Sequence, residues 1–421
     1  MHPRDLASLA GEGSIFGGSA AEKLERLQAE LKPLSCRYDV VVANPPYMGS
    51  SSLGKWMGAW VKKRYPEAYR DLCTSFIDRG FMLSAADGYS AMVTMQSWMF
   101  LGSFEKLRGK ILRNHSISSM AHLGTRAFGA IAGEVVSTAA TVFANAKTEV
   151  KGAYFRLVDM GSEAEKRAGL LEALADPGCG WFYRADADGF GAIPGSPIAY
   201  WASHGMIQAF KAFAPLKQIA RPTAGIRTGD NERFLRYVWE VEKKKSNFNS
   251  PNRNEARACG AKWFPCHKGG GFRKWYGNVD YLINWEDDGR ELSSFPGCDN
   301  AGIRYFFSPG ISWGTISSAN LSVRYSFAGM ISEHCGSMCF ANDNSDLLCC
   351  MALLNSSVSD LIHSILSPTL SFREASIGNT PASFDNEKRR IAEIAAENVE
   401  VAKKDWDSFE TSWDFERHPL V

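Results

Sequence analysis

The fold class is decided by one stretch, Tyr38-Asp39-Val40-Val41-Val42-Ala43-Asn44-Pro45-Pro46-Tyr47. Its first six residues form a β-branched run without polar alternation, which is typical of a strand buried on both faces of a parallel sheet. Pro45 and Pro46 cannot continue that strand, because proline has no backbone N–H to donate to a neighbour. The residues Asn44–Tyr47 are therefore predicted at the carboxyl end of the strand, where open α/β sheets bind ligands.

Further strands and helices are predicted on both sides of this stretch. The alternation of the two element types indicates part of an α/β sheet. A short helix precedes it and is expected to end at Pro33. The predicted strands are 89–95, 117–123, 135–144 and 153–158, and the predicted helices are 20–31, 71–85 and 104–113.

Changes in composition divide the chain into four predicted segments. Residues 161–200 are rich in Gly, Pro and small residues, which predicts a linker with irregular packing. Short aromatic-rich segments then indicate a mixed α/β or mainly β domain, and helical spacing returns from Asp385 to Glu410. The segments are an N-terminal tail and short helix (1–37), an α/β domain (38–200), a second domain (201–380) and a helical C-terminal segment (381–421).

Composition excludes several classes of protein. The chain has 421 residues, 45% of them hydrophobic and 22% charged, which fits a globular protein rather than a disordered or fibrous one. No stretch reaches the roughly 18 apolar residues of a membrane span, so no membrane association and a cytoplasmic location are expected. Without a secretory signal, the ten cysteines are expected to be free thiols.

Two loose groups of Cys and His could suggest zinc. One contains His334, Cys335 and Cys339, and the other contains Cys259, Cys266 and His267. Neither group has the paired CxxC spacing of structural zinc sites, so no metal is predicted.

The formal net charge of +1 hides a basic central region. Residues 211–330 contain 18 Lys+Arg and 11 Asp+Glu, a balance of +7, together with many aromatic residues. This combination suits a nucleic acid, since phosphates need cations and bases need planar or forked side chains. The strongest local candidates for DNA contact are Lys268, Arg273 and Lys274, which flank Gly269-Gly270-Gly271. An alternative for each of them is a solvated loop over an aromatic core.

The Asn-Pro-Pro-Tyr motif suits methylation of an amino group whose lone pair is delocalised. The side-chain oxygen of Asn44 and the backbone carbonyl of Pro45 are acceptors that can hold the two N–H bonds of such a group. Proline makes the loop rigid and adds no competing donor. Tyr47 offers a flat face on which an extruded base can stack. The alternative is that the prolines merely end a strand.

At this point the sequence resembles the adenine-N6 DNA methyltransferases, whose hallmark is this motif. It looks most like the PglX-type enzymes of the BREX phage-exclusion systems. That resemblance implies a partial Rossmann-like methyltransferase sheet followed by a target-recognition domain, and transfer of methyl from S-adenosylmethionine to adenine N6 in double-stranded DNA after base flipping. The stretches that carry it are 38–50, 71–76, 228–234 and 406–415.

The resemblance also implies roles for individual residues. Asn44, Pro45 and Pro46 would form the catalytic site together with Tyr47, which would also stack on the flipped adenine. Phe128 is the expected second stacking residue, and the alternative is an ordinary core position beside a strand. Thr228–Phe234 is expected to be a turn that leads into a helix capped by Asp230 or Asn231.

The glycine-rich cofactor loop of this family is not recognisable in the sequence. Gly11-Glu12-Gly13 and Gly17-Gly18 follow no predicted strand. We therefore expect an internal piece of a longer enzyme that alone binds cofactor weakly or not at all. Its expected partner is a polypeptide that supplies the cofactor half or other phage-defence proteins. The alternatives are a non-catalytic DNA-binding or specificity subunit, or a split-gene half, and a protein-glutamine methyltransferase, which the basic second domain disfavours.

Overall fold

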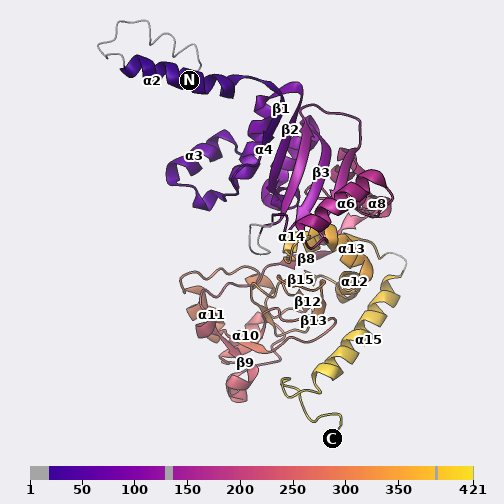
Figure 1. Ribbon diagram of the computed structural model, residues 1–421. Helices are drawn as coiled ribbons and strands as arrows, with labels where there is room; N and C mark the ends of the chain where they lie inside the picture. Colours follow the sequence, from indigo (N-terminus) through magenta and orange to yellow (C-terminus); the bar gives the residue numbers. More distant parts are fainter. Residues whose placement is uncertain (1–18, 129–135, 385–386, 421) are drawn as a thin grey trace. The chain divides into compact units, whose positions relative to one another are not determined.

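The computed structural model describes residues 19–128, 136–384 and 387–420 (Figure 1). The chain divides into two compact units, one ending at Trp201 and the other beginning at Ala202. The second unit includes the segment after residue 380, which the sequence analysis set apart. The glycines at 11–18 lie outside the described residues.

Unit 1 is built on a six-stranded mixed sheet. The strand order is β1-β2-β4-β3-β5-β6. β1 pairs with β2 in parallel and β3 with β5 in parallel, whereas β4 runs antiparallel to both of its neighbours. The strands are β1 (Tyr38–Ala43), β2 (Ser84–Met95), β3 (Ser116–Gly124), β4 (Thr138–Ala144), β5 (Gly152–Arg156) and β6 (Phe182–Ala185). The predicted α/β class is confirmed, and four of the predicted strands agree with β2–β5.

Helices cover the two faces of this sheet unequally. α4 (Leu72–Leu83) and α5 (Glu105–Asn114) contribute Ile77, Phe81 and Leu107 to the main core, against inward residues of β2, β3 and β4. α6 (Glu163–Ala175) contributes to a smaller cluster with β5. The other helices of unit 1 are α2 (Ser19–Ser35), α3 (Lys55–Arg64) and α7 (Ala187–Gly191).

The expectation that residues 38–43 form a strand buried on both faces is wrong. β1 is an edge strand of the sheet. Val41 and Ala43 pack against the core, but Val40 and Val42 on the other face are 58% and 73% exposed. The β-branched composition identified a strand correctly, but it does not show how many neighbours that strand has.

Two other predictions in unit 1 are wrong. α2 runs through Pro33 and ends at Ser35. Residues 161–200 contain the regular elements α6 and β6, because Ser162 caps α6 and β6 pairs with β5. Local Gly and Pro content concealed both elements.

Unit 2 contains two four-stranded sheets and a small two-stranded one. The strand orders are β14-β10-β11-β9, β13-β12-β15-β8 and β16-β7. The strands are β7 (Ala214–Pro215), β8 (Ala220–Thr223), β9 (Leu235–Tyr237), β10 (Trp263–His267), β11 (Tyr281–Asn284), β12 (Gly310–Trp313), β13 (Val323–Ser326), β14 (Ile331–Ser332), β15 (Met338–Ala341) and β16 (Pro381–Ala382). The mixed α/β alternative for this region is thus the one observed.

The helices of unit 2 lie before, between and after its strands, and the longest of them follow β15. α12 and α15 pack together and add to the core of the second sheet. The helices are α8 (His204–Ala212), α9 (Asn231–Phe234), α10 (Arg253–Ala258), α11 (Glu286–Ser293), α12 (Asn344–Leu354), α13 (Ser357–Leu366), α14 (Glu374–Gly378) and α15 (Lys388–Trp406). In the described part of the chain, no single helix is long and apolar enough to cross a membrane; only the sharply bent pair α12 and α13 meets that criterion by length and composition.

Candidate functional site

The Asn-Pro-Pro-Tyr motif lies directly after the carboxyl end of β1. The side chain of Asn44 is exposed, Pro45 is buried and Tyr47 is half-buried. The Tyr47 hydroxyl donates a hydrogen bond of 3.3 Å to Oδ1 of Asn44. An amide oxygen has two lone pairs, so Asn44 Oδ1 keeps capacity to accept a second donor from a ligand.

Backbone hydrogen bonds hold the chain just beyond the motif. The amide of Leu72 donates to the carbonyl of Met48 at 2.9 Å, and the amide of Ser50 donates to the carbonyl of Arg70 at 2.9 Å. Gly49 and Asp71 form an antiparallel bridge between these bonds. The chain therefore leaves the motif, passes through α3 and returns to the same point at the start of α4.

The start of α4 is fixed by side chains that the sequence analysis left without a role. Asp71 is the N-cap, and its Oδ1 accepts a hydrogen bond of 2.9 Å from the amide of Cys73. The buried hydroxyl of Thr74 donates to the carbonyls of Ala68 at 2.6 Å and Asp71 at 2.7 Å. An Asp directly before an apolar helical run was the available signal for this cap. Residues 71–76 thus support the motif through backbone geometry.

Burial keeps the groups beside the motif in their neutral forms. Partial burial, and secondarily the nearby Cys73, raise the pKa of the Tyr47 hydroxyl above its usual value. Burial raises the pKa of the Cys73 thiol strongly, and Asp71 adds to that effect. Tyr47 therefore carries a proton at neutral pH and acts here as a hydrogen-bond donor and an aromatic surface.

Phe128 lies on the same edge of the sheet as the motif. β1 is parallel to β2, and β2 and β3 both run antiparallel to β4, so β1 and β3 point in the same direction. Phe128 follows the carboxyl end of β3. The strands β2 and β4 lie between β1 and β3. The side chain of Phe128 is half-buried. Its role in stacking on a base stays a prediction.

A buried polar network at this edge escaped the sequence analysis. Both ring nitrogens of His122 on β3 form hydrogen bonds. Nε2 lies 2.6 Å from Oε1 of Gln96, and Nδ1 lies 2.9 Å from the hydroxyl oxygen of Tyr200. Burial, assisted by the charges of Arg156 and Lys166, lowers the pKa of His122 to about 3. The network holds the half-buried Gln96 at the carboxyl end of β2, and no sequence spacing links its three members.

The predicted DNA-binding residues of unit 2 all contact other groups of that unit. Lys268 lies with its Nζ 4.6 Å from the ring centre of Tyr281. Arg273 forms an ion pair of 3.0 Å with Asp405. Lys274 donates a hydrogen bond of 2.7 Å to a backbone carbonyl of residue 355. These contacts suit the structural alternative at least as well as DNA contact, so their binding role stays a prediction.

Two other stretches that carry the resemblance have structural roles in unit 2. Asp230 caps α9 by accepting a hydrogen bond of 3.1 Å from the amide of Arg233, which confirms one of the two expected caps. In the C-terminal stretch, Lys403 pairs with Asp407 at 2.5 Å and Asp414 at 3.0 Å, which fastens residues 407–414 to α15.

Possible metal donors come together at one place among the described residues. Ligand atoms of Glu333, His334 and Cys335 lie within 4.8 Å of one another. Cys339 is not a member of this group, and all ten cysteines are free. Glu333 already accepts hydrogen bonds from the ring of His334 and from the backbone amide of Cys335, at 2.5 and 2.9 Å. The buried carboxylate of Glu333 therefore has its hydrogen-bond donors within the group itself.

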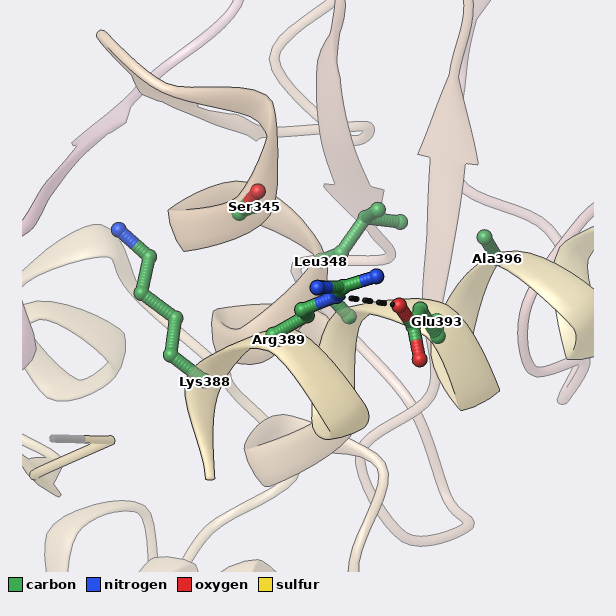
Figure 2. A pocket seen from close by; sticks show the side chains of 7 residues that line it. Ser345, Leu348, Lys388, Arg389, Glu393 and Ala396 are labelled. Atoms are coloured by element: carbon green, nitrogen blue, oxygen red, sulfur yellow. Dashed lines mark hydrogen bonds and ion pairs between the residues drawn. The ribbon is translucent and has the colours of Figure 1, made fainter. Parts of the chain in front are cut away.

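A groove of 580 Å³ between α12 and α15 contains none of the predicted site residues (Figure 2). Its cations are already paired. Arg389 forms an ion pair of 2.8 Å with Glu393, and Lys388 pairs with Asp343 and Asp346 at 2.9 and 2.7 Å. Ala396 and Leu348 give it an apolar floor. The groove reflects the packing of two helices and adds nothing to the site.

Comparison with known proteins finds a matching family and similar folds. The Eco57I restriction-modification methylase family matches residues 19–128, which include the motif and the loop from Gly49 to Asp71. The fold resembles the restriction-modification enzyme MmeI in complex with DNA, with a TM-score of 0.55 at 10% identity over 89% of this chain and 50% of that one. It also resembles the enzyme LlaGI bound to a DNA substrate mimic, with a TM-score of 0.52 at 11% identity over 94% of this chain and 44% of that one.

Two curated proteins are similar along almost the whole sequence. The adenine-specific methyltransferase PglX of Lacticaseibacillus casei (strain Zhang) is 39% identical over 399 residues, which are 93% of this chain. The adenine-specific methyltransferase BrxX of Escherichia coli O9:H4 (strain HS) is 38% identical over 424 residues, or 99% of this chain. The match covers 33% of the length of each relative. The predicted resemblance is confirmed: the chain is related to the PglX and BrxX adenine-specific methyltransferases over nearly all of its own length and over a third of theirs.

Proposed function

We propose that this chain provides the target-base site of a DNA methyltransferase that methylates adenine at N6 and takes part in phage defence. The observation that carries the proposal is the exposed side chain of Asn44 at the carboxyl end of β1, beside the half-buried ring of Tyr47. Both curated relatives are named adenine-specific methyltransferases, and the two solved structures with the same fold were determined with DNA or a DNA mimic.

The chemistry assigned to this chain is binding and orientation of the amino group. Oδ1 of Asn44 and the carbonyl of Pro45 accept the two N–H bonds of adenine N6, so that its lone pair points away from the base plane. Tyr47 stacks on the base and offsets part of the unstacking cost of a few kcal/mol. S-adenosylmethionine supplies the electrophilic methyl group when it is bound.

The described residues do not account for cofactor binding. The match covers 33% of the length of each curated relative, so most of those proteins lies outside the matched part. We therefore propose that S-adenosylmethionine is bound together with a further polypeptide segment and assign no residue of this chain to it.

A specific observation favours action with such a segment. Among the described residues no strand pairs with the outer side of β1, and Val40, Val42 and Tyr89 are exposed on one face of β1 and β2. An edge strand with an apolar face is a template for addition of another strand. The second candidate function, a DNA-binding subunit that acts only with a partner, rests on the same surface.

One experiment tests both functions. The chain is mixed with labelled S-adenosylmethionine and adenine-containing duplex DNA, with and without a polypeptide that carries the part of the L. casei relative outside the matched 399 residues. Methyl transfer to adenine N6 in the supplemented mixture, lost in Asn44→Ala, supports the methyltransferase. Salt-dependent DNA binding without transfer in either mixture supports the subunit.

A further inference from the structure

Helix α3 carries two exposed tryptophans, and the ring of Trp60 also lies 6.0 Å, centre to centre, from the ring of the buried Tyr65. Val61 is its buried residue, at 1% exposure. Trp56 and Trp60 are one helical turn apart, and at about 100° per residue Trp56 lies about 140° and Trp60 about 100° from Val61 around the helix. They are 73% and 46% exposed. Lys63 falls on the same outward face. Exposed large aromatic rings grouped in this way indicate a contact surface.

The charged side chains of α3 all have one sign. The sequence from Val40 to Pro66 contains no Asp or Glu, and α3 contains Lys55, Lys62, Lys63 and Arg64. None of these four forms an ion pair with a carboxylate of the described residues. Lys62 instead lies 5.5 Å from the ring centre of Tyr69. Four cations without acidic partners suit an anionic polymer.

The position of α3 connects this surface to the motif. The loop that carries α3 begins at Gly49, two residues beyond Tyr47, and ends at Asp71. Gly49 and Asp71 pair with each other. Figure 1 shows α3 standing apart from the sheet, beyond α4. A ligand held at Asn44 therefore lies close to the base of the loop that carries α3.

We propose that α3 binds the DNA next to the target adenine, with Lys55, Lys62, Lys63 and Arg64 on the phosphates and with Trp56 and Trp60 against exposed sugar or base faces. This inference rests on the proposed function and extends it to a second set of residues. An aromatic side chain can stack on a base left exposed in the distorted duplex, and stacking of this kind tolerates any sequence. Basic helices with tryptophan also bind anionic membranes, but attachment of the loop to the motif favours DNA.

The test measures binding of a fluorescent adenine-containing duplex across a salt series. The variants are Lys62→Ala/Lys63→Ala, Trp56→Ala and Trp56→Phe. Each lost phosphate contact lowers the slope of log affinity against log salt by about 0.9, so the double lysine variant should lower it by about two. Trp56→Ala should weaken binding about tenfold, and Trp56→Phe should retain most of it. A matched control is Lys106→Ala/Arg167→Ala, which removes two exposed cations from α5 and α6 and should leave the slope less changed.

The outcomes separate this inference from the proposed function. DNA binding by the parent chain that is unchanged in the α3 variants overturns the inference and leaves the proposed function standing. Absence of DNA binding by the parent chain, alone and with the L. casei polypeptide, counts against both. Phosphatidylserine vesicles are a second probe: loss of vesicle binding in the α3 variants, without loss of DNA binding, overturns the choice of DNA.

Discussion

The hydroxyl of Tyr47 donates to Oδ1 of Asn44 across 3.3 Å, so two residues of one tight loop are already joined before any base arrives. The side chain of Asn44 is exposed and its Oδ1 keeps a free lone pair, so it can accept a hydrogen bond from the target amino group. Replacing Asn44 by Ala removes this acceptor. We expect Asn44→Ala to lower methyl transfer by at least 100-fold, or about 3 kcal/mol, in the supplemented mixture. Affinity for the DNA duplex, measured in parallel, should change less than threefold. Loss of transfer and DNA affinity together would contradict the assigned role.

The ring and the hydroxyl of Tyr47 should make separable contributions. Tyr47→Phe keeps the stacking face and removes one hydrogen bond, which is worth about 1 kcal/mol, so transfer should fall less than tenfold. Tyr47→Ala removes the face, and stacking is worth about 1–3 kcal/mol per base, so transfer should fall by a further factor of ten or more. Transfer rates at saturating DNA measure this difference. Equal effects of both variants would show that the ring does not stack.

Asp71 should stabilise unit 1 through the cap of α4. Replacing an N-cap Asp by Ala costs about 1 kcal/mol, because the amide of Cys73 loses its acceptor. We expect Asp71→Ala to lower the free energy of unfolding by about that amount in urea titrations, and Asp71→Asn, which retains a side-chain oxygen, to lower it by a few tenths. If both variants match the parent, the cap does not contribute.

Arg108 should contribute more, because it is buried and forms four hydrogen bonds. Its guanidinium donates to the carbonyls of Trp98, Leu101 and Gly195 at 2.7–3.0 Å, and the residue is 1% exposed. Arg108→Met removes a donor from three carbonyls, of which only that of Leu101 keeps another donor among the described residues, the amide of Phe104 at 3.0 Å, and should cost at least about 3 kcal/mol in the free energy of unfolding. The exposed Arg113 on the same helix, changed to Met, is the control and should cost less than about 0.5 kcal/mol.

The sequence predicted elements that a few consecutive residues determine. It missed features that depend on which strands and side chains, distant in the sequence, lie beside an element in the fold. The strand at 38–43, the bend at Pro45 and the position of the motif follow from side-chain shape and the missing proline N–H. That β1 is an edge strand depends on which strands lie beside it, and composition does not report this.

The same distinction applies to the site. Asn44 and Tyr47 could be singled out because their chemistry is visible in four consecutive residues. The network of Gln96, His122 and Tyr200 joins residues up to 104 positions apart in the numbering, and only the folded sheet brings them together. For Arg273 and Lys274, composition suggested solvent-exposed charges, whereas the structure shows each of them bonded within unit 2.

His122 gives a prediction about pH. Its folded-state pKa is lowered to about 3, below the usual 6.5, because burial disfavours the charged ring. The unfolded chain therefore takes up a proton as pH falls below about 6.5 while the folded chain does not, so stability is retained above that pH and lost below it. Between pH 7 and pH 5 this one residue should lower the free energy of unfolding by about 2 kcal/mol. Urea unfolding at a series of pH values measures the decline, and His122→Gln, which keeps a neutral donor and acceptor but cannot titrate, should reduce it by that amount. An identical decline in the variant would mean that His122 is charged in the folded protein or that its neutral state is not what the fold requires.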